Sequence, residues 1–162
     1  MSSASSVPGI SATPQQIQEF YLLLNTLLSP QNDERNKGEQ ALKELRLHNP
    51  DILVHCLLAA LRDSATVPNA GRQMVISVLR STLTKLSTTP GDGFGLWVKL
   101  SEATRELARR ELLWALENET FAPVRRGVNT TIADVASLMF ELNSESNGQS
   151  PLWADLLPFL FK

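Results

Sequence analysis

Residues 121–142, FAPVRRGVNTTIADVASLMFEL, have the pattern of one amphipathic helix. Pro123 sits in the expected first turn, where a backbone N–H would have no helical partner. Apolar residues then recur at steps of three and four, which places them on one face of a helix. A single helix cannot bury such a face, so this stretch requires partner helices. The apolar positions are Val128, Ile132, Val135, Ala136 and Met139.

The remaining sequence supplies those partners. Six further segments have helical spacing, and they begin near residues 13, 32, 50, 69, 101 and 151. Thr13 and Gln16 form a capping box for the first of them, and Ser101 caps the fifth. The segments between helices are rich in Gly, Pro, Asn and Ser, and no segment has the alternation of a strand. The sequence therefore predicts an all-α fold.

Composition limits the class of protein. The chain has 162 residues, 43% of them hydrophobic and 20% charged, with a net charge of −2. It therefore contains enough apolar residues for a core, and it lacks the basic excess of a nucleic-acid binder. No segment is apolar enough for membrane insertion, and the N-terminus is no secretory signal. We expect a soluble, intracellular protein.

The helices also show a weak repeat. Every second helix begins with an arginine, followed seven residues later by an aliphatic residue. The three arginines are Arg35, Arg72 and Arg125. The arginines are 37 and 53 residues apart, and the longer interval contains the Gly/Pro loop near residue 91. Two helices per unit of roughly 40 residues is typical of HEAT repeats. The aliphatic residues are Leu42, Leu79 and Ile132.

This repeat predicts an α-α superhelix, a HEAT-repeat solenoid with about three helical hairpins and the first helix of a fourth. A flexible tail over residues 1–12 precedes hairpins at about 13–47, 49–87 and 100–143 and a partial unit at 150–162. The final LLPFLF is too apolar for a free end. We therefore expect a further helix of a longer array, or a partner, to cover it.

The sequence contains no catalytic or metal-binding constellation, and no cofactor is expected. His48 and His55 have no Cys, His or acidic partner at ligand spacing. Cys56 lies in an apolar run, where a buried structural thiol is favoured over a reactive one. GDGFG lacks the spacing of a phosphate-binding loop. Trp97, Trp114 and Trp153 are spread over different segments without basic neighbours on a shared face, which favours packing over base stacking.

Four pieces in order give the chain a family resemblance: FYLLLNTLLSPQNDERNKGEQAL, GRQMVISVLRSTL, RELLWALENET with VRRGVNTTIADVA, and WADLLPFLF. Together they resemble the N-terminal HEAT repeats of importin-beta (karyopherin-beta) nuclear transport receptors, nearest the importin-five (Ran-binding importin) branch. The resemblance covers about residues 15–161. Gly38, where such helices usually carry a larger residue, and the loop at 90–95 depart from it.

The resemblance implies a protein that shuttles between cytoplasm and nucleus through the nuclear pore. It implies binding of Ran-GTP on an inner face made by the second helix of each hairpin. Nucleoporin Phe-Gly repeats would bind between outer helices, and protein cargo would bind mainly to later repeats. Ran and cargo would favour different states of a flexible solenoid.

Helical geometry selects candidates for the Ran-contacting face. Taking Leu42, Leu79 and Ile132 as core centres, we expect the opposite sides of the three helices to face the partner. The candidates are Asn36, Gln40, Lys43, Gln73, Ser77, Arg80, Arg126, Thr130 and Ser137. Each could equally be an ordinary solvated residue. A HEAT scaffold of another class, such as a phosphatase regulatory subunit, is the alternative to a transport receptor.

Overall fold

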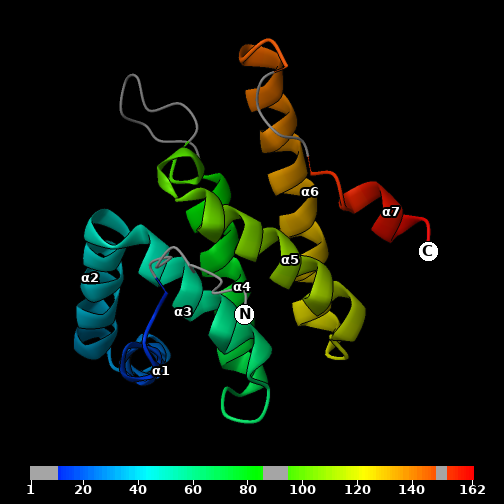
Figure 1. Cartoon of the computed structure of the whole chain (residues 1–162). Coiled ribbons are helices and arrows are strands. Elements are labelled where there is room, and N and C mark those ends of the chain that lie inside the picture. The colour runs from blue at the N-terminus through cyan, green and yellow to red at the C-terminus, as the bar shows by residue number, and fades with distance from the viewer. Residues whose placement is uncertain (1–10, 86–94, 149–152) are drawn as a thin grey trace, which may run out of the picture.

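The computed structural model of the chain describes residues 11–85, 95–148 and 153–162. These residues form seven α-helices and one short 3-10 helix, and none of them forms a strand (Figure 1). The all-α prediction is therefore confirmed. The elements are α1 (Pro14–Leu27), α2 (Asn32–His48), α3 (Pro50–Arg62), α4 (Asn69–Thr84), η1 (Trp97–Lys99), α5 (Glu102–Asn118), α6 (Ala122–Glu145) and α7 (Leu156–Leu160).

Local sequence explains where several helices begin. The Thr13 hydroxyl accepts a hydrogen bond from the Gln16 N–H at 3.2 Å, and the Gln16 side chain accepts one from the Thr13 N–H at 2.8 Å. This is the predicted capping box. The Ser101 hydroxyl accepts from the N–H of Thr104 at 3.2 Å, as a cap of α5 should. Asn49 precedes Pro50 at the start of α3, but its side chain makes no capping bond.

The helices pack as sequential pairs, and the pairs stack on one another. α1 contacts α2, α3 contacts α4, and α5 contacts α6. Between pairs, α1 contacts α3, α3 contacts α5, and α4 contacts α6. Figure 1 shows α2, α4 and α6 running in the same direction, each with its C-terminal end at the top of the view. α4 and α6 therefore lie side by side and run in the same direction.

One cluster of buried side chains runs through the stacked pairs. Leu53, Leu79, Leu112 and Val128 are completely buried, and they come from α3, α4, α5 and α6. Of the three expected core centres, Leu79 and Ile132 are buried and Leu42 is half-buried. Leu42 is less covered because α2 packs mainly on α1 and α3, at one edge of the array. The two tryptophans Trp97 and Trp153 belong to the same core.

Two departures from expectation have physical reasons. Within the described residues the last helix begins at Leu156, after a turn at residues 154–155 that follows Trp153, which packs in the core. Three predicted features lie outside the described residues: the start of the last helix at Pro151, the tail at residues 1–10 and the loop near Gly91. Gly38 is buried where α1 crosses α2, and a Cβ there would lie 3.1 Å from Leu27 Cδ2. A Cβ at this position would therefore require Leu27 to shift by a few tenths of an ångström.

Candidate protein-binding face

The nine predicted contact residues all lie on second helices, and all nine are exposed. Every candidate therefore lies on the surface that helical geometry selected. The side chains are Asn36, Gln40 and Lys43 on α2, Gln73, Ser77 and Arg80 on α4, and Arg126, Thr130 and Ser137 on α6.

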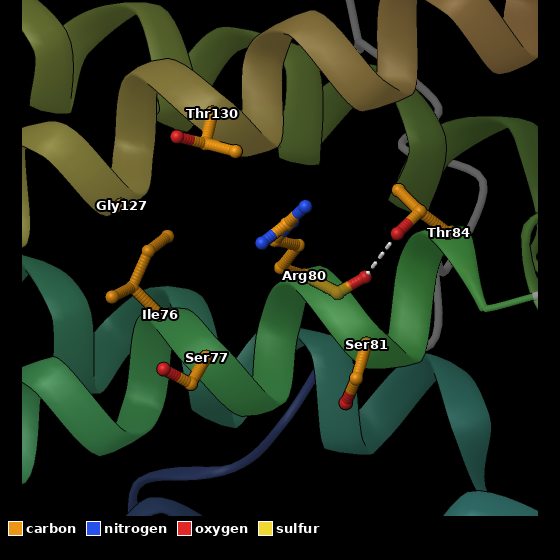
Figure 2. Close-up of a pocket in the computed structure, with 7 residues that line it drawn as sticks. All are labelled: Ile76, Ser77, Arg80, Ser81, Thr84, Gly127 and Thr130. Carbon is orange, nitrogen blue, oxygen red and sulfur yellow. Dashed lines mark hydrogen bonds between the residues drawn. The ribbon is translucent and has the colours of Figure 1, made fainter.

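A groove between α4 and α6 brings three of the candidates together. The two helices approach closely where Gly127 faces Ile76, since a Cβ on Gly127 would lie 2.8 Å from Ile76 Cγ2. Beyond that contact lies a groove of about 330 Å³ (Figure 2). It is lined by Ile76, Ser77, Arg80, Ser81, Thr84, Gly127 and Thr130. Of these, Ser77, Arg80 and Thr130 are predicted contact residues.

Among the described residues, Arg80 is the one charged side chain that lines this groove. Figure 2 shows its guanidinium in the space between α4 and α6, on the side toward Thr130. Arg80 Nε donates to Asp134 Oδ2 at 2.6 Å, and the two side chains are 49% and 36% exposed. Such solvent-exposed ion pairs contribute only about 0–1 kcal/mol, so this one can be exchanged for an intermolecular contact.

The structure does not bring all nine candidates into one groove. The three on α2 lie away from the α4–α6 groove, and α2 is linked to α4 by a hydrogen bond from Arg46 Nη2 to Thr82 Oγ1 at 3.3 Å. Gln40 donates to Glu44 on its own helix at 2.9 Å. The face thus consists of a joined α4–α6 part and a separate α2 part.

Two exposed apolar residues extend the predicted columns but were not among the candidates. Leu47 follows Lys43 by four residues and is 71% exposed, and Phe140 follows Ser137 by three and is 64% exposed. The same helical spacing that selected polar residues could have found them. Exposed large apolar side chains beside polar ones are typical of protein-binding surfaces.

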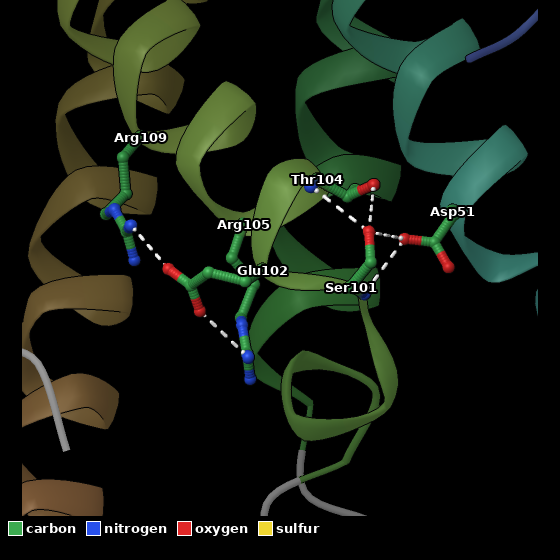
Figure 3. A network of polar contacts seen from close by, with 6 residues as sticks. All are labelled: Asp51, Ser101, Glu102, Thr104, Arg105 and Arg109. Atoms are coloured by element: carbon green, nitrogen blue, oxygen red, sulfur yellow. Dashed lines mark hydrogen bonds and ion pairs between the residues drawn. The ribbon is translucent and has the colours of Figure 1, made fainter. Parts of the chain in front are cut away.

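A second polar cluster lies between α3 and α5 (Figure 3). Asp51 Oδ1 accepts from the N–H of Ser101 at 3.0 Å and from its hydroxyl at 2.8 Å. His55 Nε2 lies 3.1 Å from Thr104 Oγ1. Ser101 thus caps α5 and, through its bonds to Asp51, ties α5 to α3.

The ionisation of this cluster fits a structural role. Burial alone would raise the pKa of Asp51, but hydrogen bonds from Thr104 and Ser101 and the charge of His55 bring it below its ordinary value. Burial lowers the pKa of His55, and the charge of Asp51 partly offsets that effect. His55 is therefore favoured in its neutral form.

Glu102, at the start of α5, pairs with Arg105 and Arg109 at 2.8 and 2.9 Å.

Cys56 behaves as a structural thiol. It is 3% exposed, and burial raises its pKa to about 11. The thiol donates a weak hydrogen bond to the Gln16 carbonyl at 3.9 Å. A thiol with so little thiolate is a poor nucleophile at neutral pH.

Three further findings bear on the class of protein. No group of acidic, Cys and His residues within the described part of the chain could hold a metal ion. No described helix is both long and apolar enough to span a membrane. No protein-family model matches the chain, and no solved structure matches it significantly.

Proposed function

We propose that this chain is the Ran-binding end of a HEAT-repeat nuclear transport receptor, and that its helix pairs are HEAT hairpins stacked into a solenoid. The packing of α1, α3 and α5 in one series and of α4 on α6 supports this arrangement, because each pair buries one face internally and another against its neighbour. The second helices α2, α4 and α6 then form the inner face.

The observation that carries the proposal is the exposure of all nine predicted residues on α2, α4 and α6. Among them are Lys43, Arg80 and Arg126, and none of the nine is acidic. This surface suits a protein partner with polar and acidic contact residues. Ran-GTP would bind here, and its differential affinity for two states of the solenoid would control cargo release during transport through the nuclear pore.

Nucleoporin Phe-Gly repeats are the second proposed partner. An apolar groove of about 310 Å³ lies among α1, α2 and α3, with Phe20, Leu23, Leu45 and Ile52 among its lining residues. A groove of this chemistry suits a phenylalanine side chain, because burial of an aromatic ring is strongly favourable. A Phe-Gly peptide should bind the chain, and a matched Ser-Gly peptide should not.

The test is a direct binding measurement with purified Ran loaded with GTP or GDP. We expect Ran-GTP to bind much more tightly than Ran-GDP. Arg126→Glu should weaken the complex, because it reverses an exposed charge on the proposed face. Arg110→Glu is the matched control, since Arg110 is an exposed arginine on α5. Equal affinity for the two nucleotide states, or no binding, would overturn the proposal, and recovery of a phosphatase instead would favour the other class of HEAT scaffold.

A further inference from the structure

The α4–α6 groove has a recognition chemistry of its own. Of the residues that the structure describes, Arg80 alone brings a charge to its lining, and the described part of α4 contains no acidic residue. The lining itself therefore carries one positive charge and no negative one, although Arg80 is paired with Asp134 beside the groove. Its volume of about 330 Å³ accommodates an entering side chain from another molecule.

The orientation of Arg80 leaves part of its guanidinium for a ligand. Asp134 contacts Nε, at 2.6 Å, and no described residue accepts a hydrogen bond from the two terminal nitrogens. Those nitrogens form the fork that binds carboxylates with two parallel hydrogen bonds. Figure 2 shows this end of Arg80 within the groove rather than against α4.

Asp134 already supplies a carboxylate to the same guanidinium. The pair is half exposed, so water competes with it and it is readily exchanged. An incoming carboxylate would gain the terminal nitrogens but would be repelled by Asp134. Asp134 should therefore reduce the affinity of the groove for anionic ligands.

We propose that the α4–α6 groove receives an aspartate or glutamate side chain of a protein partner, with the terminal nitrogens of Arg80 as the anchor and with Asp134 as a neighbouring carboxylate whose charge weakens the contact. This inference rests on the proposed function, because it assumes that the α4–α6 face binds a protein, and it names the chemistry of one contact in that interface.

The site can be tested without Ran. We would titrate the ¹⁵N-labelled chain with a hexaglutamate peptide and follow the Arg80 side-chain signals and the amide signals of the groove by NMR. Hexaglutamine and inorganic phosphate are parallel arms. We expect shifts confined to the groove with hexaglutamate, and much smaller ones with either of the other two. Equal shifts with phosphate would overturn the assignment to a protein carboxylate, and shifts spread over all exposed arginines would overturn the site.

Four variants at exposed or half-exposed positions make the test specific. Arg80→Gln should weaken hexaglutamate binding about fivefold, the upper end of what a half-exposed ion pair contributes. Arg125→Gln removes another exposed arginine of α6, outside the groove, and should change hexaglutamate affinity less than about twofold. Asp134→Asn should tighten binding severalfold, whereas Glu141→Gln, which removes an exposed acid elsewhere on α6, should not. Weaker binding by Asp134→Asn, or equal effects of Arg80→Gln and Arg125→Gln, would contradict the proposal.

The two proposals fail separately. If hexaglutamate binds as described but Ran-GTP does not bind, the groove is an acidic-side-chain site and the transport assignment is wrong. If Ran-GTP binds and Arg80→Gln leaves its affinity unchanged, the face is correct and the groove inference is wrong.

Discussion

Neutralising Glu119 should destabilise the fold far more than neutralising an exposed acid of the same helix pair. Arg72, at the start of α4, and Glu119, between α5 and α6, form an ion pair with side chains only 5% and 7% exposed. Arg72 Nε also donates to the Leu61 carbonyl at 3.3 Å. Burial lowers the pKa of Arg72, but an arginine remains protonated in proteins. Without the carboxylate, its charge would be buried with no counter-ion.

Glu119→Gln isolates this effect. The amide keeps the side-chain size and the oxygen that accepts from the Phe121 N–H at 2.8 Å, and it removes the negative charge. Breaking a buried ion pair from one side costs about 3–5 kcal/mol. A domain of this size loses about 2–4 °C in melting temperature for each kcal/mol, so the expected drop is roughly 6–20 °C. Glu117→Gln, at an exposed position of α5, should shift stability by less than about 0.5 kcal/mol.

Urea unfolding followed by circular dichroism measures both variants. The double variant Arg72→Met with Glu119→Leu should recover much of the loss, because it removes the whole buried pair rather than one half. A cost below about 1 kcal/mol for Glu119→Gln would show that the carboxylate is not needed to balance a buried charge. A double variant no more stable than the single one would lead to the same conclusion.

Three other predictions concern the core. The free energy of unfolding should fall as pH drops below about 6.5, because the pKa of His55 is lower in the folded chain and the unfolded chain takes up the proton first. His55→Gln should flatten that slope and His48→Gln, at an exposed position, should not. Cys56, with its pKa raised to about 11, should resist iodoacetamide at pH 8 in the folded chain and react on unfolding in urea. Gly127→Ala should destabilise the chain by about 1–3 kcal/mol despite the better helix propensity of alanine. The cost of Gly127→Ala should be smaller in a chain that already carries Ile76→Ala, and a double-mutant cycle in urea measures this difference.

Helix positions could be predicted because their signals are local. Thr13 and Gln16 lie three residues apart, and the capping box they form depends on nothing else in the chain. The exposed faces of α2, α4 and α6 likewise follow from the period of 3.6 residues. The buried aliphatic positions Leu79 and Ile132 were found in the same way.

The groove could not be predicted, because it depends on contacts between distant residues. Gly127 and Ile76 line it together because the glycine lets α6 approach Ile76, and the sequence does not show which helix faces that glycine. The Arg80–Asp134 pair joins residues 54 apart in the chain. The pairing of Arg72 with Glu119 is equally non-local. The repeat pattern placed Arg72 at a helix start, but it did not indicate that its charge would be buried.

The most direct test of the binding face is amide hydrogen exchange of the chain alone, with Ran-GDP and with Ran-GTP, read by mass spectrometry. Ran-GTP should slow exchange in α2, α4 and α6 and leave α1, α3 and α5 near their unbound rates, with little change from Ran-GDP. Protection confined to α1, α3 and α5, or the same protection with both nucleotides, would show that the second helices are not the Ran-binding face.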